Sequence, residues 1–262
     1  MKKTLLAVLL GSFALASFAQ PITIEKQGAF SAGGTVIEAK KTFDPYHPEP
    51  DAMTLHGDHA NIIYQIPAHA KPVSLMFLHG AGQSMRTWQT TPDGREGFQS
   101  VFLRKGYPVY LIDQPRRGDA GRATVDGTIK ASPDEQFWFG QFRMGLWPKF
   151  YDNSAFASQK DLNSFWRQMT PNTAPYNDKV IADAVTDALK KTEGTVLVTH
   201  SQGCGPGWLI GTEAGKNLKA SLPLNRVPAL FSRKAKCLHR FPTTASSARQ
   251  KQSAFPLVSS KS

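Results

Sequence analysis

Cysteine is scarce in this chain of 262 residues, which contains Cys204 and Cys237 and no others. Two cysteines cannot provide the disulfide framework of a small secreted domain. Acidic residues are absent after Glu213, whereas ten lysines or arginines follow it. The net charge of +11 therefore belongs to the last segment, because residues 1–213 hold 21 basic and 20 acidic residues. Without a folded basic motif, this distribution argues against nucleic-acid binding.

The N-terminus has the pattern of a secretory signal peptide. A positively charged start precedes an apolar run from Thr4 to Ala19, and Ser17 adds a second small residue before the expected cleavage site. The run is too short for a stable membrane span, although an N-terminal anchor stays the alternative. We expect residues 1–19 to be removed and the mature protein to be periplasmic or secreted, without a membrane span.

The next forty residues are predicted to be β structure. Ser31–Gly34 is predicted to be the turn of a hairpin between Ile22–Glu25 and Thr35–Ala39. Leu55–Pro67 is predicted to form a turn and then a strand. His56 and its neighbours Asp58 and His59 are metal-ligand types, but no further ligand has suitable spacing, so a surface loop is the favoured interpretation. We expect no metal and no organic cofactor.

A strand, a glycine loop, a helix and a strand follow in order. Pro72–Leu78 and Tyr107–Asp113 are apolar runs, and Phe98–Lys105 between them has helical spacing. This order predicts a βαβ unit and a parallel sheet. The first strand runs into His79-Gly80-Ala81-Gly82, where glycines allow backbone N–H groups to face a developing negative charge. A plain glycine turn with a structural histidine is the alternative.

An aromatic-rich segment over 128–176 interrupts this alternation. It is predicted to be a cap insertion, either a lid with an apolar pocket over the site or a local core of its own. After it, Val180–Lys191 is predicted to be an amphipathic helix that Asn177 caps and Gly194 follows. The aromatic residues of the insertion are Phe137, Trp138, Phe139, Phe142, Trp147, Phe150, Tyr151, Phe165 and Trp166.

The β-branched run Gly194–His200 then ends abruptly at Ser201, and small residues follow. This pattern is typical of a buried parallel strand that turns sharply into a helix and exposes a serine hydroxyl at the carboxyl edge of the sheet. Thr199 replaces the first glycine of Gly-x-Ser-x-Gly, whereas Gly203 keeps the second. Alone, Ser-x-Gly after a strand is weak support for a nucleophile.

Together, the His-Gly-x-Gly loop, the third strand with Arg117-Gly118, the aromatic insertion and Thr199–Gly203 resemble the α/β-hydrolase fold of secreted bacterial esterases with a Ser–Glu–His triad. The resemblance covers roughly residues 30–212 and implies a mostly parallel sheet with helices on both faces. It divides the chain into a signal peptide, an incomplete hydrolase domain over 20–213 with its cap at 128–176, and a basic tail over 214–262.

By resemblance, Ser201 is the nucleophile of an acyl-enzyme mechanism on a small ester, and the backbone N–H groups of Gln202 and Ala81 form the oxyanion hole. The supporting loop residues are His79, Gly80, Gly82 and Gly203. The triad acid and histidine are not identifiable: Glu213 and His239 are the only acidic residue and the only histidine after Ser201. His200 is a poor base if adjacent strand side chains point to opposite faces.

The tail lacks the later strands, the acid and the histidine of such a hydrolase. We expect it to be out of frame or disordered, and the chain as written to have very low esterase activity. Two other interpretations stay open. One is a non-catalytic hydrolase-like protein of the cell envelope with a basic, anion-binding tail; the other is a lipase, thioesterase or amidase.

The reading-frame hypothesis can be tested on the gene. One adenine restored at codons 216–217 permits the sequence Lys-Leu-Lys-Gly-Ile-Ile-Ala-Phe-Glu-Pro-Gly, an apolar strand that ends in a carboxylate. Sequencing is expected to find an adenine tract there. A gene without such a tract contradicts the hypothesis.

Overall fold

The computed structural model describes residues 21–127, 129–156 and 158–224. The predicted signal peptide and the tail from residue 225 onward lie outside them. The elements in chain order, with η for 3-10 helices, are β1 (Ile24–Ala32), β2 (Thr35–Ile37), η1 (Pro50–Ala52), β3 (Leu55–Gly57), β4 (Ala60–Pro67), β5 (Ser74–Leu78), η2 (Met85–Trp88), α1 (Phe98–Arg104), β6 (Val109–Asp113), η3 (Gly118–Ala120), α2 (Glu135–Gln141), β7 (Gly145–Leu146), β8 (Lys149–Phe150), α3 (Gln159–Trp166), α4 (Asp178–Leu189), β9 (Thr195–His200), η4 (Ser201–Gly203), α5 (Cys204–Glu213), η5 (Gly215–Asn217) and β10 (Leu218–Leu224).

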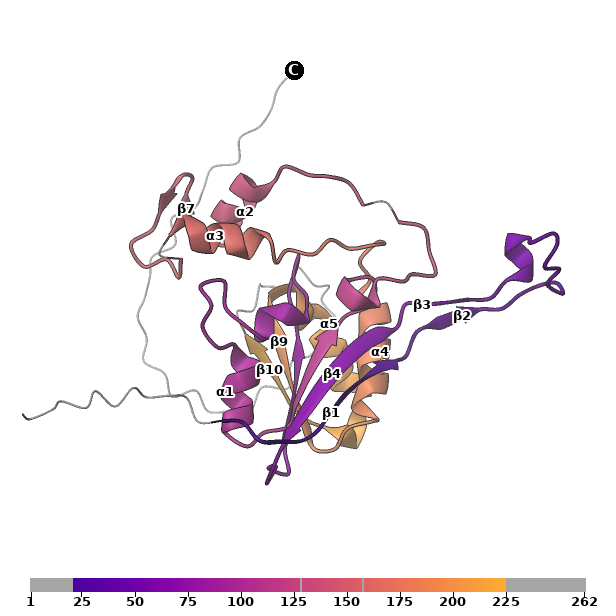
Figure 1. Ribbon diagram of the computed structural model, residues 1–262, viewed down its shortest axis with the longest axis horizontal. Coiled ribbons are helices and arrows are strands. Elements are labelled where there is room, and N and C mark those ends of the chain that lie inside the picture. The colour runs from indigo at the N-terminus through magenta and orange to yellow at the C-terminus, as the bar shows by residue number, and fades with distance from the viewer. Residues whose placement is uncertain (1–20, 128, 157, 225–262) are drawn as a thin grey trace, which may run out of the picture. The chain divides into compact units, whose positions relative to one another are not determined.

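A six-stranded sheet of order β1-β4-β6-β5-β9-β10 forms the centre of the described chain (Figure 1). β6, β5, β9 and β10 run parallel, whereas β4 is antiparallel to both β1 and β6. Leu78 of β5 pairs with Ile112 of β6 on one side and with Thr199 of β9 on the other. The mostly parallel sheet is thus confirmed, and the carboxyl ends of these three strands meet at one edge.

Helices cover both faces of the sheet, as expected. Successive side chains of a strand point to opposite faces. Met76 of β5 therefore packs in a core with Ile181 and Val185 of α4, while the next residue, Phe77, packs in a second core with Leu103 of α1. Met76 and Phe77 of the strand are fully buried, and the two α4 residues are at most 2% exposed. The buried strand β5 is therefore apolar on both faces.

Asn177 caps helix α4 as the sequence predicted, and the helix spans Asp178–Leu189 rather than Val180–Lys191. The Asn177 side chain accepts hydrogen bonds from the backbone N–H groups of Lys179 and Val180, at 3.0 and 3.1 Å. Asparagine at this position satisfies N–H groups that have no partner inside the helix. The predicted helix over 98–105 is also confirmed as α1, and the predicted strands over 72–78, 107–113 and 194–200 as β5, β6 and β9.

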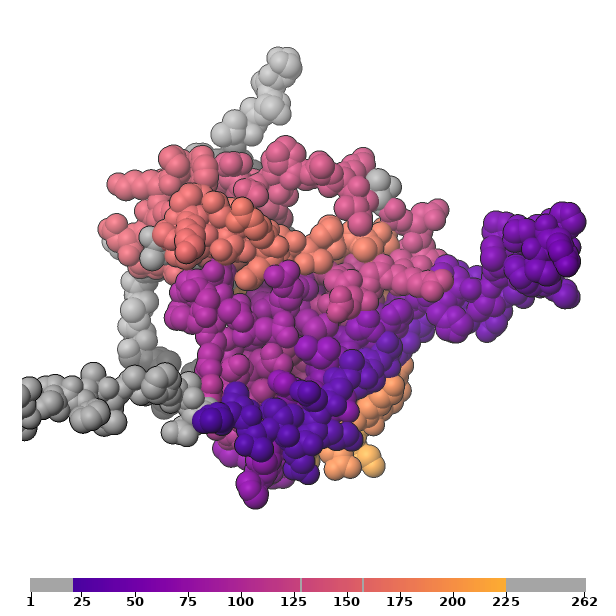
Figure 2. All heavy atoms as spheres, viewed as in Figure 1, coloured from indigo at the N-terminus to yellow at the C-terminus, as the bar shows by residue number. Residues whose placement is uncertain are grey.

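The predicted hairpin between Ile22–Glu25 and Thr35–Ala39 is wrong. β1 extends as far as Ala32 and pairs antiparallel with β4, and β2 pairs with β3 instead. The β2–β3 ribbon projects from the sheet as an arm (Figures 1 and 2). Gly33 ends β1 at a φ of 63°, and a Cβ on it would lie 2.6 Å from the Ala184 Cα of α4. The glycine thus permits a close helix contact rather than a hairpin turn.

The expectation that no strand follows Glu213 is also wrong for the described part of the tail. β10 pairs parallel with β9, and Leu224 lies opposite His200. Apolar residues occupy every second position, 218, 220, 222 and 224, and this period-two pattern could have predicted the strand. The strand is largely exposed, and Pro223 fits an outer strand because it cannot donate to a further neighbour.

The aromatic insertion contains a core of its own. Phe139, Met144 and Leu162 are at most 4% exposed and pack with partly buried aromatic residues of the same segment. The local core that the sequence left as one alternative is therefore present. Other aromatic side chains stay outside it, and Phe137 is 60% exposed. A lid role for the segment stays a prediction.

The favoured surface-loop interpretation of His56, Asp58 and His59 is wrong for Asp58. Its carboxylate is 3% exposed and accepts two hydrogen bonds from the Arg116 guanidinium, at 2.7 and 2.9 Å. Thr124 Oγ1 donates a third at 2.5 Å. These hydrogen bonds, those from Arg116 foremost, hold the pKa of Asp58 below its ordinary value. The pair fastens the end of β3 to the loop after β6.

Among the described residues, no helix combines the length and the apolar character that crossing a membrane requires.

We predict that Asp58→Asn lowers the free energy of unfolding by about 3–5 kcal/mol at pH 7, because it leaves a buried guanidinium without its carboxylate. Urea denaturation measures the loss. Asp183→Asn, which breaks the exposed pair with Lys179 in α4, is the control and costs under about 0.5 kcal/mol.

The same pair predicts a pH dependence. Because the folded-state pKa of Asp58 is lowered, its stabilisation is present above the unfolded-state pKa of about 3.9 and is lost as the pH falls through the folded-state value. The stability gap between the native protein and Asp58→Asn should therefore shrink below about pH 4. A gap that stays constant down to pH 2 contradicts this account.

Candidate functional site

The candidate site lies where β5 and β9 end. β9 ends at His200, and the chain turns through Ser201 into η4 and α5. Ser201 has a φ of 52°, in the left-handed region that residues other than glycine rarely adopt. A serine held in this conformation between a strand and a helix is the expected geometry of a nucleophile turn. The role of Ser201 itself stays a prediction.

Glycine brings the loop after β5 against this turn. A Cβ placed on Gly80 would lie 3.1 Å from the Ser201 Cβ, and one placed on Gly203 would lie 2.5 Å from the His79 carbonyl oxygen. Two chain segments more than a hundred residues apart therefore meet backbone to backbone. The structure brings together the serine and the His-Gly-x-Gly loop that the sequence singled out.

His79 is fully buried behind this loop and is uncharged. Its Nδ1 donates to the Gly80 carbonyl oxygen at 3.1 Å, and its Nε2 accepts from the Gln114 N–H at 3.4 Å. Burial, with a smaller contribution from the Arg117 charge, lowers the pKa of His79 to about 3. Asp113 lies 3.7 Å from His79 Nε2, but a neutral imidazole makes no ion pair. With both nitrogens occupied, His79 supports the loop rather than accepting a proton.

The Asp113 carboxylate joins two loops at the end of β6. It accepts hydrogen bonds from the Met85 N–H at 2.6 Å and from the Asp119 N–H at 2.9 Å. Burial raises the pKa of Asp113, while these N–H groups oppose the rise. Gly118, at a φ of 56°, is required there because a Cβ would overlap the carboxylate. Asp113 therefore ties the segment after β5 to the loop after β6.

His200 does not follow the alternation argument made from the sequence. Ser201 is left-handed and lies beyond the strand, so alternation no longer relates the two side chains. His200 Nδ1 and the Gly80 N–H both lie 3.2 Å from Gln83 Oε1, so His200 also faces the loop. Burial lowers the pKa of His200.

The segment that leaves the aromatic insertion contacts the same loop. The Thr170 N–H donates to the Gly82 carbonyl oxygen at 2.7 Å. Gly82 has a φ of 64°, and a Cβ on it would overlap the Met169 methyl group. Two residues on, Asn172 binds the guanidinium of Arg117. The cap is thus tied to the loop beside Ser201 by backbone and side-chain contacts.

Arg117 and Tyr176 are site residues that the motif analysis gave no role. Arg117 Nη1 donates to the Gly80 carbonyl oxygen at 2.8 Å. The Tyr176 hydroxyl lies 2.5 Å from Asp178 Oδ1 and 3.5 Å from the Gln202 carbonyl oxygen. Burial, followed by the hydrogen bond to Asp178, raises the pKa of Tyr176 far above its ordinary value. The sequence signal for Arg117 was its place in the loop that follows the third predicted strand.

No triad acid or histidine is found in the described chain. Glu213 is exposed at the last residue of α5, and His239 lies outside the described residues. Within the described ranges, no three histidine, cysteine, aspartate or glutamate residues gather as metal ligands.

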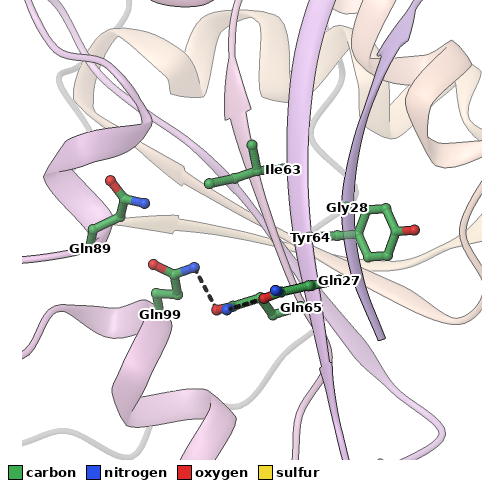
Figure 3. A pocket seen from close by; sticks show the side chains of 7 residues that line it. All are labelled: Gln27, Gly28, Ile63, Tyr64, Gln65, Gln89 and Gln99. Atoms are coloured by element: carbon green, nitrogen blue, oxygen red, sulfur yellow. Dashed lines mark hydrogen bonds between the residues drawn. The ribbon is translucent and has the colours of Figure 1, made fainter. Parts of the chain in front are cut away.

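A hollow of about 330 Å³ lies elsewhere on the sheet (Figure 3). Four glutamines line it, of which Gln65 bridges Gln27 and Gln99 by hydrogen bonds of 3.1 and 2.9 Å. Gln65 pairs with Val109, the first residue of β6. The hollow therefore lies toward the opposite end of the strand from the edge that carries Ser201.

The chain is similar in sequence to a curated protein and to a protein of known structure. A probable secreted lipase of a fungal species is 30% identical over 173 residues, which make up 63% of this chain and 48% of that protein. The chain thus spans about half the length of this curated relative. A bacterial esterase of known structure is 29% identical, with a TM-score of 0.65 over 78% of this chain and 68% of that one.

A peroxisomal α/β-hydrolase of Saccharomyces cerevisiae aligns over 82% of this chain and 48% of its own, at 16% identity. The TM-score of this alignment is 0.37. No protein-family profile matches the chain.

We predict that the backbone of Ser201 is strained. Ser201→Gly should be more stable than Ser201→Ala by about 1 kcal/mol, because both remove the hydroxyl but only glycine adopts a positive φ freely. The matched control is Ser31 in β1, where glycine should be less stable than alanine by about 0.5–1 kcal/mol. Urea denaturation of the four variants measures this, and equal stability of the two Ser201 variants contradicts the strain.

Proposed function

Because this chain belongs to the α/β-hydrolase superfamily, we propose that it is a serine hydrolase built to cleave carboxylic esters, with Ser201 as nucleophile. The observation that carries the proposal is the left-handed Ser201 at the end of β9, against the backbone of Gly80. The esterase and the secreted lipase named above support the same reaction class.

The proposed reaction begins when Ser201 Oγ attacks the ester carbonyl carbon. A bond forms from Oγ to carbon, and the carbonyl oxygen becomes an oxyanion that the N–H groups of Ala81 and Gln202 stabilise. As the ester C–O bond breaks, the proton that Ser201 Oγ has lost passes to the departing alcohol. Water then attacks the acyl-enzyme, the acid leaves, and Ser201 Oγ regains a proton. The Gln202 N–H suits this role because the first N–H groups of a helix have no partner inside it.

We identify no triad acid or histidine, the groups that would move the proton, in the chain as written. We propose that a base lost near codon 216 removed them, so that activity here is very low. The strand β10 supports this hypothesis. In the restored frame, suitable codons permit an apolar strand over 218–224 and glutamate at codon 225. Because Leu224 pairs with His200, that carboxylate would lie level with Ser201 on the neighbouring strand.

The substrate we propose is a small ester of the short-chain type, and the site of action is the periplasm or the medium. The name of the secreted lipase and the N-terminal signal pattern support secretion. The insertion, which is tied to the loop beside Ser201, is the proposed lid.

The experiment compares the chain as written with a frame-restored gene. We expect the restored protein to hydrolyse p-nitrophenyl acetate and to react with a fluorophosphonate probe, and the chain as written to be slower by several orders of magnitude. Ser201→Ala should abolish both signals, whereas Ser31→Ala, at an exposed serine of β1, should keep them. A restored protein inert to both reagents contradicts the proposed function.

A further inference from the structure

The carbonyl oxygen of Gly80 is held by three donors. Arg117 Nη1 lies 2.8 Å from it, His79 Nδ1 3.1 Å and the backbone N–H of Gln83 3.3 Å. All three residues are rigidly placed: His79 is fully buried, Arg117 is 2% exposed, and Gln83 also binds the Gly80 N–H through its side chain. The direction of this carbonyl is therefore fixed.

Fixing the carbonyl also fixes the next N–H. Gly80 C=O and Ala81 N–H belong to one planar trans peptide, so they point in opposite directions. Since Arg117, His79 and Gln83 surround the oxygen, the Ala81 N–H faces away from them. Among the described residues, none accepts a hydrogen bond from it. The loop that lies against Ser201 thus carries an unpaired donor, the Ala81 N–H, in a fixed direction.

The Arg117 guanidinium is unusual because it is buried without a carboxylate. Within the described chain, no carboxylate oxygen lies within 4.0 Å of it. Its other partner is the amide oxygen of Asn172, which Nε and Nη2 both approach, Nε at 2.8 Å. Burial lowers the pKa of Arg117 to about 10, so it keeps its charge at neutral pH. The positive charge therefore has no carboxylate in direct contact, although the buried Asp113 carboxylate attracts it from farther away, and it lies one peptide unit from the Ala81 N–H.

Burying an unpaired charge is costly unless something nearby is stabilised by it. A carbonyl that accepts a hydrogen bond from a cation is polarised, and the N–H of the same peptide becomes a stronger donor. The positive charge of Arg117 and the stronger Ala81 N–H donor both act where an oxyanion would form. Both stabilise a developing negative charge more than they stabilise a neutral substrate.

We propose that Arg117 is a positioning residue of the oxyanion hole. Asn172 holds the Arg117 guanidinium in place, and the guanidinium orients and polarises the Ala81 N–H through the Gly80 carbonyl. This inference rests on the proposed function of Ser201. A purely structural Arg117 would only fasten the end of the aromatic insertion to the loop. The two roles differ in one respect, because only the first makes binding selective for a tetrahedral anion over a trigonal carbonyl.

The test measures that selectivity on the chain as written, and it does not need turnover. Butaneboronic acid becomes a tetrahedral anion when it bonds to a serine oxygen, whereas butyramide stays trigonal. NMR titrations give the affinity for each, and boron NMR reports the tetrahedral adduct. Ser201→Ala serves as the reference without the adduct.

We expect Arg117→Met to weaken boronic-acid binding by roughly tenfold or more and butyramide binding by less than about twofold. Asn172→Ala, which leaves the charge but frees the guanidinium, should weaken the boronic acid by about two- to fivefold. Arg95→Met removes an exposed positive charge and should change neither affinity. Arg117→Lys, which keeps the charge but loses the fork, gives an intermediate loss and replaces Arg117→Met if that variant does not fold.

Equal losses for both ligands, or no loss for the boronic acid in Arg117→Lys and Asn172→Ala, would overturn the positioning role. If neither the chain as written nor the frame-restored protein forms a tetrahedral adduct beyond that of its Ser201→Ala variant, the proposed nucleophile fails instead, and the inference that rests on it fails too. The two failures are distinguishable because the second appears in the native chain and the first only in the variants.

Discussion

The contact between two backbones at the carboxyl edge of the sheet is the constraint on which the site depends. Gly80 and Gly203 allow the loop after β5 to lie against the turn after β9, because a Cβ at either position would come within about 3.1 Å of its neighbour. The parallel pairing of β5 with β9 sets both strand ends at the same level. Every other feature of the site either follows from this contact or maintains it.

The polar groups behind the loop maintain it. His79, Asp113 and Arg117 are all buried, and each binds backbone atoms rather than another charged group. Such an arrangement fixes peptide directions, because a backbone hydrogen bond to a buried, rigid side chain leaves little freedom for the peptide to rotate. Burial makes the same groups costly, as the lowered pKa of His79 and the raised pKa of Asp113 show.

The cap joins the same network from the other side. Thr170 binds the loop through its backbone, and Asn172 binds the guanidinium that in turn holds Gly80. A change in the position of the insertion would therefore reach the loop beside Ser201 through two routes. This is a physical connection between the segment proposed as a lid and the proposed oxyanion donors.

Much of the fold could be predicted from local sequence. Apolar runs predicted β5, β6 and β9, and helical spacing with Asn177 predicted α4. The residues around Ser201 predicted the turn after β9. The errors concern pairing and burial. The Gly33 turn was expected to make a hairpin, but β1 pairs with β4 along its length, from Ile24 to Ala32, whereas β2 is three residues long and pairs with β3. Asp58 was placed in a surface loop, since its partner Arg116 lies 58 residues away.

By itself, the sequence determined β5, β6, β9, α1 and α4, their order along the chain, and the two glycine-flanked motifs, because these follow from residue spacing and backbone preference. Only the tertiary structure decided which strands pair, that Ser201 takes a left-handed φ against Gly80, and that Arg117 rather than an acid stands behind the loop. Those facts depend on contacts between residues that are distant in sequence, and local patterns carry no information about such contacts.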